Sequence, residues 1–220
     1  MRGCYTLAMS LLPPDNDLEP IHTRQYETRV YRAGEDELLV RGAVSDVKPG
    51  GLYVLDDPEP LEVHQMQIEL RVALPHLEIT AARVLFESHP HEKCPLICED
   101  YEQLVGVSIA RGFSRKIQEL FGRQRGCTHT NALLQAMAPA VVQATWSVSI
   151  QRSRDAGRSP GLHGTADREA RIDANTNTCH IWDERGEHVA ALKRGDPPQR
   201  PMLVIEERLR ELGRDDTRWE

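Results

Sequence analysis

The clearest alternation of apolar and polar positions in the chain lies between His64 and Val72. From Met66 onward, every even position is apolar and every odd position is polar. Such strict alternation is typical of a strand with one buried face and one solvated face. His64 falls on the apolar side, so we expect its side chain to point inward, either as an ordinary core-edge histidine or as a site residue.

Three neighbouring segments also have the pattern of strands. Residues 22–31 and 38–44 flank a turn sequence at 33–36 and together predict a hairpin. In residues 77–86 the apolar positions change from odd to even near Ala81, which predicts a β-bulge. We therefore expect an antiparallel sheet of about four strands in the N-terminal half.

The second half has the spacing of helices. Residues 99–107 form a short amphipathic segment, and the apolar residues of 113–121 recur at helical intervals. The longest apolar helix is expected from Asn131 to about residue 145, where Pro139 should kink or split it. The expected fold class is therefore α+β, with an antiparallel sheet packed against two or three helices.

The C-terminal part is expected to be less regular. Residues 151–171 contain five arginines and a Pro-Gly pair, which indicates a flexible insertion. Residues 178–192 are interpreted as a closing hairpin, and 203–212 as an amphipathic helix. The predicted organisation is a disordered leader at 1–20, one α+β domain at 21–195 and a helical tail at 196–220.

Composition narrows the classes of function. The formal net charge of −7 argues against binding to nucleic acid, which requires clustered basic residues. No run approaches the roughly 18 apolar residues of a membrane helix, and the N-terminal apolar stretch is a poor signal peptide. The five cysteines are an odd number, which favours reduced thiols and a cytoplasmic protein. Translation could begin at Met1 or Met9, and a homo-oligomer is left open.

The segment Gly126-Cys127-Thr128-His129 has the strongest chemical character in the chain. Cys127 precedes the predicted apolar helix, and the unpaired amides at a helix N-terminus stabilise a thiolate. His129 could serve as its base or as a metal ligand. The structural alternative is a buried cysteine beside a polar turn residue.

A metal site is a second interpretation of the same residues. A zinc or iron site requires three or four ligands, which Cys94, Cys127, His129 and either Cys179 or His180 could supply. Adjacent residues of a strand face opposite sides, so Cys179 and His180 are not expected to point inward together. The irregular spacing matches no zinc-ribbon pattern.

Asp46, Lys48 and His64 form a further candidate constellation at the edge of the predicted sheet. In a continuing strand, Asp46 and Lys48 share one side, so they could transfer protons or orient a base. The alternative is an ordinary surface ion pair worth under about 1 kcal/mol.

Several short motifs together resemble a family of bacterial proteins known only as a domain of unknown function. The resemblance covers roughly residues 20–190, although the family has an acidic residue where Gln65 stands and tryptophan where Phe113 stands. It implies that the candidate residues of both halves act as one set, without supplying an activity. The motifs are His22-Thr23-Arg24, Tyr31-Arg32, Asp46-Val47-Lys48, His64-Gln65-Met66, Cys94-Pro95, the segment from Gly112, Gly126-Cys127-Thr128-His129 and Asn177-Thr178-Cys179-His180.

The leading hypothesis is a small-molecule enzyme of bacterial catabolism, a lyase or a hydrolase. It would use Cys127 and His129, either with a bound zinc or iron ion or with a free thiolate, assisted by His64, Asp46 and Lys48. The competing hypothesis is a non-catalytic ligand-binding or assembly protein with a structural zinc cluster. A carrier of metal or sulfur is a third interpretation.

Overall fold

The structure is a computed structural model that describes residues 12–13, 17–110, 112–157, 169, 172–195 and 203–214. The chain divides into two compact units, Met1–Trp146 and Ser147–Glu220, which are described separately. The boundary predicted from the sequence, after residue 195, falls inside the second of these units. Most of the predicted leader lies outside the described residues, and residues 17–21 are exposed without strand or helix.

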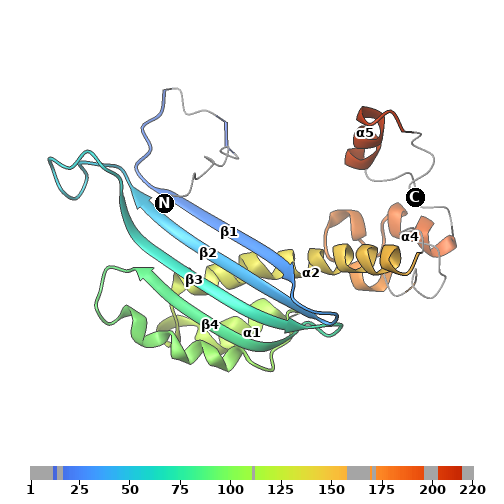
Figure 1. Cartoon of the computed structure of the whole chain (residues 1–220), viewed down its shortest axis with the longest axis horizontal. Helices are drawn as coiled ribbons and strands as arrows, with labels where there is room; N and C mark the ends of the chain where they lie inside the picture. The colour runs from blue at the N-terminus through green and yellow to red at the C-terminus, as the bar shows by residue number, and fades with distance from the viewer. Residues whose placement is uncertain are drawn as a thin grey trace. The chain divides into compact units, whose positions relative to one another are not determined.

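Unit 1 is built on a four-stranded antiparallel sheet in the order β1-β2-β3-β4, which confirms the predicted sheet and the α+β class (Figure 1). The alternation in β3 is also confirmed, since Met66, Ile68, Leu70 and Val72 are all at most 2% exposed. The register of β3 with β4 shifts at Thr80, beside the predicted bulge at Ala81. The strands are β1 (Thr23–Arg32), β2 (Glu37–Lys48), β3 (Leu61–Ala73) and β4 (Glu78–Ser88).

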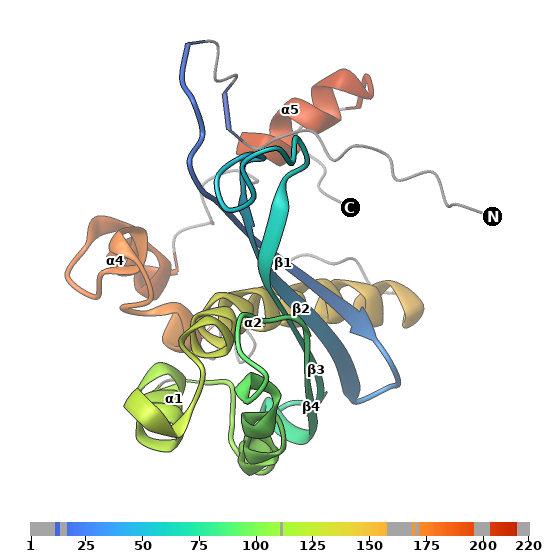
Figure 2. The same cartoon turned by 90° about the vertical axis from the view of Figure 1, so that its left-hand side faces the viewer.

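Helical segments cover the inner face of this sheet, the face that carries the buried even positions of β3. Helix α2 runs across it (Figures 1 and 2). Gly42 of β2 lacks a Cβ, and an added Cβ there would collide with Met137 of α2, so this glycine permits close packing of helix on sheet. The segments of unit 1 are η1 (Cys94–Ile97), η2 (Glu99–Leu104), α1 (Phe113–Phe121), η3 (Arg123–Arg125) and the first part of α2 (Thr128–Asp155).

Helix α2 departs from its predicted bounds. It begins at Thr128, three residues before the predicted start, and it continues through Pro139 without splitting. It also includes residues 151–155, so the predicted insertion is wrong there, while residues 158–168 lie outside the described residues. By length and composition alone, α2 could cross a membrane, but Leu133 and Val141 are buried in the core, and core helices share this composition.

In unit 2 the predicted C-terminal hairpin is wrong. Residues 178–192 form η4 (His180–Trp182) and most of α4 (Glu187–Arg194), not strands. The short alternation around His188 is outweighed by helix-favouring residues, and Gly195 caps α4 in the left-handed conformation. The terminal helix predicted at 203–212 is confirmed as α5 (Leu203–Glu211).

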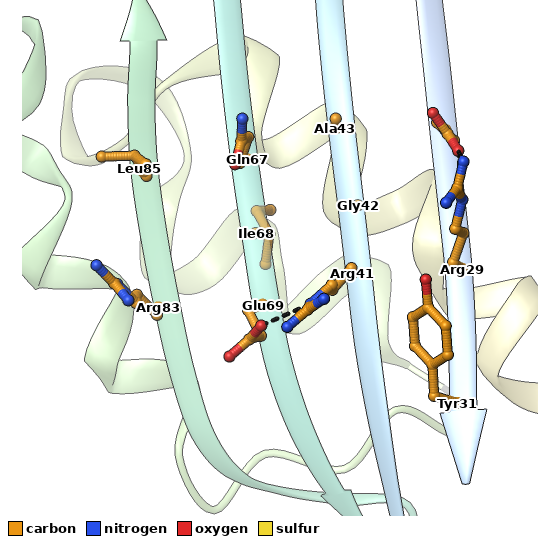
Figure 3. Close-up of a pocket in the computed structure, with 11 residues that line it drawn as sticks. Arg29, Tyr31, Arg41, Gly42, Ala43, Gln67, Ile68, Glu69, Arg83 and Leu85 are labelled. Atoms are coloured by element: carbon orange, nitrogen blue, oxygen red, sulfur yellow. Dashed lines mark hydrogen bonds and ion pairs between the residues drawn. The ribbon is translucent and has the colours of Figure 1, made fainter. Parts of the chain in front are cut away.

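The outer face of the sheet carries charged side chains in pairs (Figure 3). Arg41 of β2 donates to Glu69 of β3 at 2.8 Å, and Arg29 pairs with Glu27 along β1. These residues line an open cavity of about 410 Å³. Because these guanidinium groups are already paired, the polarity of this face is that of a solvated sheet surface.

Candidate metal centre

Three strands place polar side chains in one row across the inner face. Asp46 of β2 lies directly opposite Arg24 of β1 and His64 of β3. Side chains opposite one another in an antiparallel sheet are close neighbours. The row stands where the register of β2 and β3 shifts after Asp46, so it marks the end of the regular apolar core.

Helix α2 contributes His129 from its first turn. Its start is fixed by a buried network around Tyr101 of η2, whose hydroxyl accepts the Cys127 N–H at 2.9 Å and donates to Asn131 Oδ1 at 2.9 Å. Asn131 in turn donates to the Phe121 carbonyl at 2.7 Å. Gly126 is required here because a Cβ would lie 2.6 Å from Phe121 Cβ. The network therefore sets where His129 stands.

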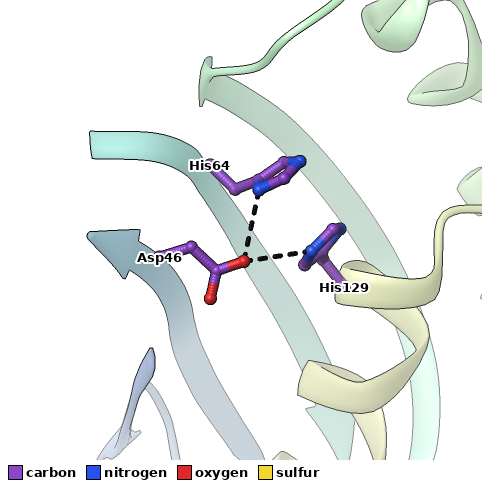
Figure 4. Close-up of side chains that lie close together, drawn as sticks. All are labelled: Asp46, His64 and His129. Atoms are coloured by element: carbon purple, nitrogen blue, oxygen red, sulfur yellow. Dashed lines mark ion pairs between the residues drawn. The ribbon is translucent and has the colours of Figure 1, made fainter. Parts of the chain in front are cut away.

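Asp46, His64 and His129 form the Asp46 triad (Figure 4). Asp46 Oδ2 lies 3.2 Å from His64 Nδ1 and 3.1 Å from His129 Nε2, and one ligand atom from each residue lies within 4.8 Å of the others. The two imidazole rings are stacked, with centroids 4.0 Å apart and planes inclined by 28°. This group could hold a metal ion.

The Asp46 carboxylate is buried and surrounded by nitrogen atoms of basic side chains. Its side chain is 2% exposed, and Arg24 donates Nε to Oδ1 at 2.6 Å and Nη2 to Oδ2 at 2.7 Å. His22 Nε2 lies 3.3 Å from Oδ1. The bond to Arg24 lowers the pKa of Asp46 to about 2, against the opposing effect of burial. Asp46 is therefore an anion at neutral pH.

His129 joins the triad to Cys127. Its Nδ1 lies 3.7 Å from Cys127 Sγ, while its Nε2 faces Asp46. Burial lowers the pKa of His129, and the neighbouring His64 and Arg24 add to this effect. The imidazole is therefore mostly neutral at pH 7, which is the form that binds a metal or accepts a proton.

The remaining predicted site residues lie elsewhere. Lys48 ends β2 opposite Leu61, beyond the register shift, and it is not among the described partners of Asp46. Cys94 begins η1 and is half-buried, outside the described metal-ligating group. Cys179 and His180 belong to unit 2, where Cys179 is exposed, so their place in one common site stays a prediction.

Sequence reasoning missed Arg24, His22 and Tyr101 as parts of the site. A signal for the first two existed, because they have the same parity as Tyr26 and Val30 in β1 and so face the inner side. For Tyr101 there was none, since its partners Cys127 and Asn131 are 26 and 30 residues away.

Comparison with known protein families gives a match. A family described as "Protein of unknown function (DUF2889)" matches residues 22–143, which is more than half of the chain. The matched range contains the Asp46 triad together with His22 and Arg24, and it excludes Cys179 and His180. No curated protein and no solved structure matches the chain. The predicted resemblance to a family of unknown function is thereby confirmed.

Proposed function

We propose that this chain, which belongs to the DUF2889 family of proteins of unknown function, is a small-molecule enzyme with one divalent metal ion bound by the Asp46 triad. Asp46 Oδ2, His64 Nδ1 and His129 Nε2 would be its protein ligands. Two imidazoles and one carboxylate suit zinc or iron(II) and leave coordination positions open. An ion there would act as a Lewis acid or activate water.

The observation that carries this proposal is the state of His64 Nδ1. It is buried and has no hydrogen-bond partner among the described residues, although Asp46 Oδ2 is 3.2 Å away. A polar atom buried beside an acceptor without a hydrogen bond requires an explanation, and a role as a metal ligand is one such explanation. The atom is within reach of both other members of the triad.

The distances within the triad fit the same ligand role. Two donors about 2.1 Å from one ion are separated by about 3.0 Å at a right angle and about 3.4 Å at the tetrahedral angle. The separations of 3.2 and 3.1 Å from Asp46 Oδ2 fall between these values. Because a metal lies in the plane of each imidazole that binds it, we expect the angle between the planes of the two rings to increase from 28° when a metal binds.

Metal titration of the full chain tests the proposal. After removal of all metal, zinc or iron(II) should bind with a stoichiometry near one, and His64→Gln and His129→Gln should abolish this binding. The matched control is His76→Gln, because His76 is exposed in the β3–β4 turn. Stoichiometric binding that survives both triad substitutions, or no binding to the wild type, would contradict the proposal.

One observation favours a second function, in which Cys127 is a nucleophile. Cys127 Sγ, His129 and Asp46 lie in series, with the thiol at Nδ1 and the carboxylate at Nε2 of the same ring. This is the arrangement of a nucleophile, its base and an orienting group. It predicts that metal-free Cys127 is alkylated by iodoacetamide more slowly after His129→Gln, measured by mass spectrometry of the modified peptide. An unchanged rate would exclude it.

A further inference from the structure

The arrangement around Asp46 also points to the kind of small molecule that such a site would take. We propose that the site selects a small carboxylate, held by Arg24 beside the ion, and this inference rests on the metal-binding function proposed above. It follows from three features of the described residues: the charge balance of the site, the free donors of Arg24 and the exposure of β1.

The charge balance favours an anion. Arg24 and Asp46 form a bidentate ion pair, so their charges cancel. Histidines bind a metal as neutral imidazoles, so a divalent ion would leave Arg24 and the triad together with a net charge of about +2. No further carboxylate is among the described ligand atoms within 4.8 Å. A negatively charged ligand would complete the site.

Arg24 has donors left for such a ligand. A guanidinium carries five N–H groups. Asp46 accepts from two of them, and the Tyr26 hydroxyl is a further partner, which leaves donors on a planar fork suited to a carboxylate. The side chain is 37% exposed, and the neighbouring His22 is 35% exposed. Arg24 stands on β1 at the edge of the sheet, and His22 directly precedes this strand, so a ligand can approach both from solvent.

The distance between Arg24 and the proposed ion is one that a single carboxylate group could bridge. Nη2 lies 2.7 Å from Asp46 Oδ2. An ion bound to that oxygen at about 2.1 Å therefore stands less than about 5 Å from Nη2. One carboxylate oxygen could bind the ion at about 2.1 Å while the other accepts from the guanidinium at about 2.8 Å.

Visible absorption of the cobalt(II)-loaded full chain tests the inference, with malonate as the probe and neutral malonamide as its matched comparison. Malonate should shift the cobalt bands and malonamide should not. At saturating cobalt, Arg24→Gln should weaken malonate binding by about tenfold or more, because a charge-assisted hydrogen bond is lost. Arg29→Gln is the control, since it removes the same charge from the outer face of the same strand.

The outcomes separate the two proposals. Failure of the wild type to bind cobalt refutes the metal site itself. Cobalt binding with equal responses to malonate and malonamide, or with full malonate affinity in Arg24→Gln, refutes the carboxylate inference alone. If the Arg24→Gln variant no longer binds cobalt, the test uses Arg24→Lys instead, because lysine keeps the positive charge but lacks the paired donors of the guanidinium group. It should bind malonate more weakly than the wild type, and equal affinity would refute the role of Arg24.

Discussion

Asp46 offers the sharpest test of the electrostatics of this fold. Its carboxylate is 2% exposed, and its two oxygens accept from Arg24 at 2.6 and 2.7 Å. Asp46→Asn keeps the shape of the side chain and removes its charge. The variant should fold less stably at neutral pH in the absence of metal, because Arg24 loses its ionic partner.

The magnitude follows from the pKa of Asp46. That pKa falls from 3.8 to about 2 on folding, mainly through the bond to Arg24. At about 1.4 kcal/mol per pKa unit, the anion contributes about 2 to 3 kcal/mol to the free energy of unfolding. The larger loss of about 3–5 kcal/mol expected for a broken buried pair should not occur, because Arg24 is 37% exposed and can be solvated.

The lowered pKa of Asp46 also determines how its contribution to stability changes with pH. A carboxyl whose pKa is lowered by folding stabilises the protein above its unfolded pKa, and this contribution is lost as the pH falls toward the folded pKa. The difference in unfolding free energy between wild type and Asp46→Asn should therefore be full above pH 5 and shrink between pH 4 and about pH 2.

Urea denaturation of the metal-free chain, followed by circular dichroism across this pH range, measures the difference. Glu87→Gln is the matched control, because Glu87 is an exposed acid of β4. Destabilisation by Asp46→Asn of less than about 0.5 kcal/mol at pH 7 would refute this reasoning, since that is the range of ordinary surface substitutions. A difference that does not change with pH would refute it equally.

Three further predictions concern the groups around Asp46. Tyr101→Phe should cost about 1–3 kcal/mol of stability and weaken metal binding, measured by denaturation and calorimetry, because the Cys127 N–H and Asn131 lose a buried partner. Burial lowers the pKa of His129, so the unfolded chain binds this proton more readily than the folded protein does, and the free energy of unfolding should decrease as the pH falls below about 6.5. In His129→Gln the free energy of unfolding should depend less on pH in this range. His64→Leu should leave the metal-free protein as stable as the wild type or more stable, while it abolishes metal binding in the same titration.

The sheet and the inward direction of His64 were predictable because both rest on local periodicity. The period of two in β3 fixes which face each side chain takes, and burial of Met66 and Ile68 follows directly. The bulge beside Ala81 was visible for the same reason, as a change of phase in the apolar positions. Asp46 could be placed near His64 only as a candidate, since pairing of the two strands decides the register.

The contact of His129 with Asp46 and His64 was not predictable from the spacing of residues in the sequence. It depends on where α2 begins, and the Tyr101 network decides this across 26 residues. The predicted hairpin at 178–192 failed for a related reason, because a short alternation cannot be distinguished from an amphipathic helix by pattern alone. Local sequence patterns thus failed to predict long-range contacts and the secondary structure of short segments.

The crowding of nitrogen atoms at Asp46 Oδ2 is the main geometric argument for the proposed metal site. Three nitrogens, from Arg24, His64 and His129, approach this one oxygen within 3.2 Å, yet Arg24 alone already stabilises the anion. If His64 Nδ1 carries a proton, that proton is not donated to the carboxylate. If it carries a lone pair, the lone pair faces an oxygen of the same polarity. Either state is unfavourable in the metal-free protein, and a cation bound between the three ligand atoms relieves both. The positions of the two histidines therefore support the cation site proposed above.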